Sequence, residues 1–197
     1  MSGMLDLPIF PLRTVLFPGG VLPLKIFEQR YMDMAKDCLK RDLPFGVCLI
    51  VEGAEVGAPA LPHEVGTTAR IAAWDMPQLG VLQVTARGEQ RFRILERRTG
   101  RDGLVRATAE WIAPDPPQQV PEDLRGLLPL LRAIAADLGE ERMPPPHDFD
   151  DAAWVGCRYA EVLPIPLAAR QKLLELEDAL MRLTVISQFL AQKGLVG

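Results

Sequence analysis

The chain has few of the side chains that carry covalent or metal chemistry. Its 197 residues include two histidines and three cysteines, and its two serines are Ser2 and Ser187. No G-x-S-x-G motif surrounds either serine, so a serine hydrolase is not indicated. His63 and His147 stand far apart in proline-flanked loops, where a lone histidine makes a poor metal site. We therefore expect no catalytic residue and no bound metal.

The cysteines also point away from metal and disulfide chemistry. Cys38, Cys48 and Cys157 are widely spaced, and no C-x-x-C pair occurs. Such spacing is typical of small buried hydrophobic residues in a reducing compartment. A G-x-x-x-x-G-K-[ST] loop and a strand-linked G-x-G-x-x-G motif are both lacking, so we expect no nucleotide cofactor.

Long apolar runs and an excess of positive charge are lacking as well. No stretch of about 18 apolar residues suggests a membrane span, and no signal peptide is evident, so we expect a soluble, cytoplasmic protein. The net charge of −4 disfavours nucleic acid as the partner. The densest basic stretch, residues 87–101, is interpreted as the solvated face of a strand.

A proline-rich segment at residues 113–121 divides the chain, since its prolines cannot continue a helix or a central strand. Before it, apolar residues alternate as in half-buried strands, with turns expected at Gly88 and at Gly100–Gly103. One amphipathic helix is expected over residues 28–40. The expected strands are residues 45–51, 68–74, 79–86, 91–95 and 104–112.

After the proline-rich segment the apolar spacing is helical. A stripe over residues 124–138 ends at Gly139, and Pro129 within it predicts either a kink or a later helix start. A second helix is expected over residues 149–162, capped by Asp148.

The last helix is predicted to run unbroken over residues 166–194. Glu175, Glu177 and Asp178 would form its wet face, and Asp178 would pair with Arg182. Its apolar stripe, Leu173–Leu190, suits either the interior of a bundle or a docking surface such as a dimer contact.

Three ordered blocks resemble a known family. Residues 7–34 read LPIFPLRTVLFPGGVLPLKIFEQRYMDM, and residues 163–186 read LPIPLAARQKLLELEDALMRLTVI. Between them, HEVGTTARIAAW (63–74) is followed by RGEQRFRILE (87–96). Together these blocks resemble the Lon protease N-terminal domain, also called the Lon substrate-binding domain.

The resemblance implies an α+β fold. A PUA-like six-stranded β pseudo-barrel with one helix would occupy residues 1–117, and an α-helical bundle ending in a long helix would occupy residues 118–197. The chain would be a stand-alone copy without the ATPase and Ser–Lys peptidase modules of Lon, and therefore not an enzyme. The implied role is to bind unfolded or tagged polypeptides, or to act as an adaptor for a separate protease or chaperone, as a monomer or weak dimer.

Eight residues are candidates for the polypeptide-binding surface. Five lie in the first block, where they either form a surface at the barrel mouth or serve the packing and the helix start. Three flank a turn expected around Pro77, as exposed apolar contacts or as a hydrophobic lid. The candidates are Arg13, Phe17, Glu28, Arg30, Tyr31, Trp74, Met76 and Leu79.

Two other functions stay open at this point. PUA-like domains often bind RNA, and the arginines of residues 87–101 are the support for that alternative. A cleft between the two parts of the chain could also hold a small-molecule enzyme site.

Overall fold

The computed structural model describes residues 5–196. The chain divides into two compact units, residues 1–113 and residues 114–197, with the boundary inside the proline-rich segment. The described residues form seven strands, all in the first unit, and helices in both. The α+β class with a C-terminal helical part is therefore confirmed.

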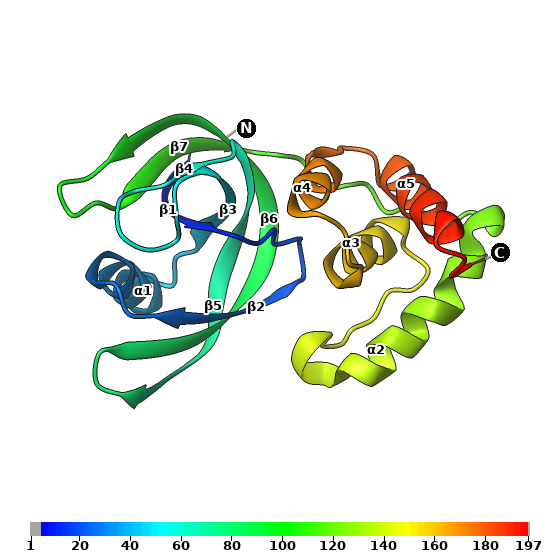
Figure 1. The fold of residues 1–197 in the computed structure, drawn as a ribbon, viewed down its shortest axis with the longest axis horizontal. Coiled ribbons are helices and arrows are strands. Elements are labelled where there is room, and N and C mark those ends of the chain that lie inside the picture. The colour runs from blue at the N-terminus through cyan, green and yellow to red at the C-terminus, as the bar shows by residue number, and fades with distance from the viewer. Residues whose placement is uncertain (1–4, 197) are drawn as a thin grey trace. The chain divides into compact units, whose positions relative to one another are not determined.

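The strands of unit 1 close into a ring. Following their pairings gives the order β1-β7-β6-β5-β3, and β3 then pairs in parallel with β1. β2 (Val21–Ile26) pairs with β6 outside this ring, and the two-residue β4 (Leu61–Pro62) pairs with β3. Figure 1 shows these strands curling around one another beside α1 (Gln29–Arg41). The ring strands are β1 (Leu5–Leu12), β3 (Phe45–Glu52), β5 (Val65–Gln78), β6 (Val81–Thr99) and β7 (Val105–Trp111).

β6 is one continuous strand, so the turn predicted at Gly88 is wrong. The glycine is needed for a close backbone approach instead. Gly19 N donates to Gly88 O at 2.8 Å, and Gly88 N donates to Gly20 O at 2.9 Å. A Cβ on Gly88 would collide with the carbonyl oxygen of Phe17. The strand thus passes directly against the 17–20 turn, which only a residue without a side chain permits.

The β5–β6 and β6–β7 hairpin turns of unit 1 lie at glycines with positive φ. Gly103 (φ 78) lies in the β6–β7 turn, as the sequence predicted. The β5–β6 turn lies at Leu79–Gly80, with Gly80 at φ 83. The turn expected around Pro77 is therefore displaced along the chain, because Pro77 still belongs to β5.

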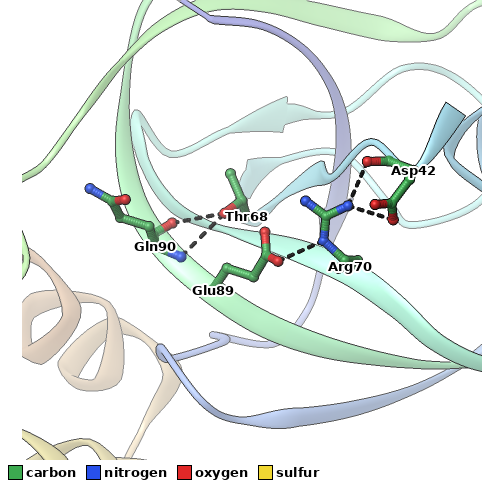
Figure 2. Close-up of polar contacts among 5 residues, drawn as sticks. All are labelled: Asp42, Thr68, Arg70, Glu89 and Gln90. Atoms are coloured by element: carbon green, nitrogen blue, oxygen red, sulfur yellow. Dashed lines mark hydrogen bonds and ion pairs between the residues drawn. The ribbon is translucent and has the colours of Figure 1, made fainter. Parts of the chain in front are cut away.

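The outer half of the β5–β6 hairpin extends beyond the ring (Figure 1). β5 pairs with β3 only as far as Ala69, and beyond it pairs with β6 alone. Arg70 follows at once and bridges two elements, donating from Nε to Glu89 at 2.7 Å and from Nη1 to the Asp42 carboxylate at 2.7 Å (Figure 2). Hydrogen bonds to these carboxylates raise the pKa of Arg70. Asp42 ends α1, so this network fixes the base of the hairpin against the helix.

Figure 2 also shows a second polar link at the same level. Gln90 N donates to Thr68 Oγ1 at 3.2 Å, and Thr68 Oγ1 lies 3.2 Å from Gln90 O. The β5–β6 register shifts here, between Thr67 and Ala69. The threonine hydroxyl thus supplies hydrogen bonds where the ladder is irregular.

Unit 2 consists of short helices. Pro129 lies in the first turn of α2 (Leu128–Arg142), behind the 3-10 helix η1 (Glu122–Leu127), which confirms the later start rather than a mid-helix kink. Gly139 (φ 70) interrupts the helical geometry where the stop was expected. α3 (Ala152–Val162) is capped by Asp151, whose Oδ2 accepts from Trp154 N at 3.0 Å, so the predicted cap at Asp148 is wrong.

The long terminal helix predicted from the sequence is also wrong. Residues 167–192 form two helices, α4 (Leu167–Glu175) and α5 (Ala179–Gln192). Leu176 and Asp178 are extended, and Asp178 caps α5 by accepting a hydrogen bond from Met181 N at 3.0 Å. The acidic residues that suggested a wet helical face instead surround a helix break: Glu175 ends α4, and Asp178 caps α5.

Arg182 holds this break together from inside the unit. Its guanidinium is 1% exposed and donates to Asp115 Oδ2 at 2.7 Å and to the carbonyl of Leu173 at 2.9 Å. It also donates to the carbonyl of Leu176. These carbonyls lie at the C-terminal end of α4, where the last carbonyl groups of a helix need partners from outside the helix. The predicted Asp178–Arg182 ion pair is wrong because the arginine turns inward.

Candidate polypeptide-binding surface

Two grooves adjoin β2 and share residues 23–25 in their linings. The first, named the β2 groove, has a volume of about 360 Å³. The second, named the hairpin groove, has a volume of about 400 Å³. The β2 groove is lined by Phe10, Leu12, Thr14, residues 22–28, Tyr31, Glu55 and Val56. The hairpin groove is lined by residues 23–25, 73–75 and 83–85.

The alternation of β2 gives its two sides different chemistry. Leu22 and Leu24 pack against the core of unit 1, while Pro23 and Lys25 are exposed on the opposite face. Among the described residues, β2 pairs only with β6. Its other edge therefore keeps main-chain groups that no strand of residues 5–196 uses.

The end of the β5–β6 hairpin carries exposed apolar side chains. Trp74 is 58% exposed and Leu79 is 97% exposed, and Met76 is exposed too. Trp74 also lines the hairpin groove beside Pro23 and Leu24. An apolar surface of this kind, away from the core, is a common feature of sites that bind other polypeptides.

The candidate residues of the first block separate into buried and accessible ones. Phe17 is fully buried and Arg30 is 8% exposed, so neither offers an open contact surface. Arg30 donates to Glu28 Oε2 at 3.0 Å and to Gly103 O at 3.1 Å, which ties the start of α1 to the β6–β7 turn. Arg13 remains exposed and donates from Nη2 to Gly53 O at 3.2 Å.

The aromatic residues beside this segment differ in their exposure. Phe27 is 54% exposed and lines the β2 groove. Tyr31 is buried and stacks on Phe10, with ring centroids 4.0 Å apart. Burial raises the pKa of Tyr31, the charge of Arg30 opposes that rise, and Glu28 and Glu55 add to it.

The arginine-rich stretch does not form one solvated face. Arg91 is only 3% exposed, which corrects the interpretation of residues 87–101. Arg98 Nη2 lies 2.9 Å from the carboxylate of Asp6, and Arg93 Nε lies 3.9 Å from that of Glu110. The acidic partners interrupt the positive surface, which reduces its suitability for a phosphate backbone.

Metal ligands, reactive thiols and a membrane span find little support in the part of the chain that the structure describes. Residues 5–196 contain no group of three or more His, Cys, Asp or Glu side chains placed to hold a metal ion. Cys38, Cys48 and Cys157 are free and buried, and burial raises the pKa of each thiol. Within the same residues, no helix has the length and apolar character needed to cross a bilayer.

Comparison with known families fits this arrangement. Residues 6–192 match the family described as the ATP-dependent protease La (LON) substrate-binding domain. The chain belongs to this family. A substrate-recognition role is therefore supported at the level of the Lon substrate-binding domain.

Solved structures agree with the family. The Lon N-terminal domain protein from Xanthomonas campestris is 36% identical, with a TM-score of 0.78, over 95% of this chain and 98% of that one. The N-terminal domain of the Mycobacterium avium complex Lon protease shares the fold, at 17% identity and a TM-score of 0.65, over 94% and 98% of the two chains.

Curated relatives are much longer. The Lon protease of Anaeromyxobacter dehalogenans is 28% identical over 95% of this chain and 23% of its own length. Protein cereblon of Danio rerio is 32% identical over 56% of this chain and 27% of its own. The chain thus spans about a quarter of the length of these relatives.

Sequence reasoning missed part of the β2 groove. Glu55 and Val56 were left unassigned, although Gly53 and Gly57, both with positive φ, bracket them. Pro23 and Lys25 were also missed, although the alternation in VLPLKI places them on one face. That alternation was the available signal, while the position of residues 53–57 depends on neighbours distant in sequence.

Proposed function

We propose that this chain recognises non-native polypeptide segments through the exposed end of the β5–β6 hairpin and the adjoining hairpin groove. One observation carries the proposal: Trp74 and Leu79 are largely exposed on a hairpin that extends beyond the ring. The family's substrate-binding description supports the same interpretation. Unfolded chains expose apolar side chains that native proteins bury, so such a surface favours them.

The same proposal assigns no chemical step to this chain. It would present or deliver polypeptides as an adaptor, and any nucleotide or peptide hydrolysis would belong to a separate protein. Purified protein should therefore hydrolyse neither ATP nor casein. Turnover that persists through purification and follows the protein across a gel-filtration peak would contradict this part.

Equilibrium binding tests the recognition itself. Fluorescently labelled, reduced and carboxymethylated α-lactalbumin, which cannot refold, should bind, and native α-lactalbumin should not. The double variant Trp74→Ser/Leu79→Ser should weaken binding by about tenfold or more, because each buried apolar side chain contributes roughly 1.5–3 kcal/mol. Equal affinity of wild type and variant would refute the assignment to the hairpin.

A matched control is available on α5. Met181 and Val185 are 53% and 42% exposed and belong to unit 2. Met181→Ser/Val185→Ser removes a comparable exposed apolar pair and should leave the affinity unchanged. Labelled single-stranded RNA in the same assay tests the RNA alternative, for which tight, salt-dependent binding would be required.

A further inference from the structure

The Tyr31 hydroxyl has no role in the packing of unit 1. The residue is 4% exposed, and its ring stacks on Phe10 with an interplanar angle of 18° while lining the β2 groove. No hydrogen-bond partner for the hydroxyl exists among residues 5–196. The hydroxyl oxygen itself is not fully buried, so it is open to the groove, where water or a ligand can bond to it.

Two carboxylates line the same groove and each keeps one uncommitted oxygen. Glu28 Oε2 accepts from Arg30 Nη2 at 3.0 Å and from Gly57 N at 3.4 Å. Glu55 Oε1 accepts from the backbone N of Arg13. The remaining oxygens, Glu28 Oε1 and Glu55 Oε2, have no partner among residues 5–196. Both carboxylates line the β2 groove together with Tyr31, and the charge of each adds to the rise in the pKa of the Tyr31 phenol.

Three cations lie near these groups. Arg30 lies over the Tyr31 ring, with its guanidinium carbon 4.7 Å from the ring centroid, and donates to Glu28 and to the carbonyl of Gly103. Arg13 directs its guanidinium to the carbonyl of Gly53. Lys25 is exposed and lines the β2 groove as well, and it forms no ion pair with another of the residues 5–196. The groove thus presents three hydrogen-bond acceptors, two of them charged, and a cationic donor is their chemical complement.

The rest of the groove suits an extended peptide. Leu22, Leu24, Phe27 and Val56 give it apolar walls. The edge of β2 that does not face β6 offers main-chain groups along its length, apart from the donor that Pro23 lacks. An extended segment can place side chains into such a groove at alternate positions while its backbone follows the strand edge.

We propose that the β2 groove binds an extended polypeptide segment in which a Lys or Arg side chain is flanked by apolar residues. The cationic group donates to Glu28 Oε1, Glu55 Oε2 and the Tyr31 hydroxyl, and the apolar neighbours lie against Leu22, Leu24 and Val56. This inference rests on the proposed function and names the class of segment that is selected. It concerns the β2 groove, whereas the hairpin surface selects only for apolar character.

Peptide binding measured by fluorescence anisotropy tests the inference. The probes are acetylated, amidated peptides, Val-Leu-Arg-Val-Leu and the same peptide with citrulline in place of arginine. The arginine peptide should bind about tenfold more tightly, since citrulline keeps the shape and loses the charge. This advantage should shrink as salt is raised. A citrulline peptide that binds equally well, or the absence of binding by both peptides, would overturn the proposal.

Two conservative variants locate the site. Glu55→Gln keeps an oxygen for the Arg13 amide and Tyr31→Phe keeps the stack on Phe10, so both should fold. Glu55→Gln should abolish most of the arginine preference and Tyr31→Phe should reduce it. Asp37→Asn, at an exposed carboxylate of α1 that lines neither groove, should not change it. If Glu55→Gln kept the full preference for the arginine peptide, the assignment of the binding site to the β2 groove would be refuted.

The outcomes separate this inference from the proposed function. Loss of the arginine preference with intact binding of unfolded α-lactalbumin would remove the β2-groove site and leave the hairpin function standing. Failure to bind any unfolded polypeptide would remove both. A peptide without arginine that binds only when its N-terminus is free would show that an α-amino group is recognised, which contradicts the side-chain assignment.

Discussion

Arg182 should be the most sensitive single position of unit 2. Its side chain is 1% exposed, that of Asp115 is 8% exposed, and the guanidinium also bonds two carbonyls at the α4–α5 break. Arg182→Met fills the space but leaves the buried carboxylate and both carbonyls without this donor. Removing one partner of a buried ion pair costs roughly 3–5 kcal/mol, so the free energy of unfolding should fall by about that amount.

Urea denaturation followed by circular dichroism measures this change. Arg98→Ala is the matched control, because its ion pair with Asp6 is more than half exposed and should contribute no more than about 1 kcal/mol. The double variant Arg182→Met/Asp115→Asn should be more stable than Arg182→Met alone, since it also removes the buried negative charge that Arg182 balanced. If Arg182→Met lost no more stability than Arg98→Ala, the role assigned to the buried pair would be refuted.

Three further predictions concern unit 1 and a glycine control. Gly66→Ala should cost about 1–3 kcal/mol of stability, because its Cβ would lie 2.6 Å from Cys48 Sγ. The control Gly126→Ala places its Cβ where no atom lies within 4 Å, so it should cost far less stability. Thermal melts compare the two variants. Burial raises the pKa of Cys38 from 9.0 to about 11, so between these pH values the folded state keeps the thiol proton that the unfolded state releases. Stability measured in urea should therefore fall as pH rises from about 9 to 11. A Cys38→Ala variant whose stability falls equally over this pH range would contradict this. Arg70→Ala should lower the free energy of unfolding by only about 1 kcal/mol or less, because the ion pairs of Arg70 are partly exposed, and this loss should shrink as salt is added. A loss above about 2 kcal/mol would contradict the prediction.

Much of unit 1 follows from local patterns in the sequence. The helix expected over residues 28–40 is present as Gln29–Arg41, because its apolar stripe and its polar face are both local. The alternation near residues 104–112 likewise predicts β7. Gly88 failed as a turn because its reason, the approach of residues 17–20, lies far away in the sequence.

The terminal helix shows a different limit. Apolar residues continue at helical spacing through residues 173–190, so periodicity alone predicts one helix. The break depends on Asp178 acting as a cap and on Arg182 turning inward to Asp115. An aspartate can either cap a helix or lie on the solvent-exposed face of one. Local sequence does not distinguish the two roles of Asp178, because the break also depends on the distant contact between Arg182 and Asp115.

The candidate surface was predictable in part. The exposure expected for Trp74, Met76 and Leu79 follows from their place at a hairpin end, although the turn lies at Leu79–Gly80 rather than at Pro77. The burial of Phe17 agrees with the packing role that the sequence left open for the first block. The sequence could not reveal that Glu55 reaches Arg13, because that hydrogen bond joins residues 42 positions apart.

Hydrogen–deuterium exchange tests most directly whether the hairpin recognises non-native polypeptide. Exchange would be followed by mass spectrometry on the full chain, with and without saturating carboxymethylated α-lactalbumin. The account predicts that added protection concentrates in residues 21–28 and 72–85 and is lost in Trp74→Ser/Leu79→Ser. Protection confined to unit 2, or an unchanged exchange pattern at saturation, would contradict it.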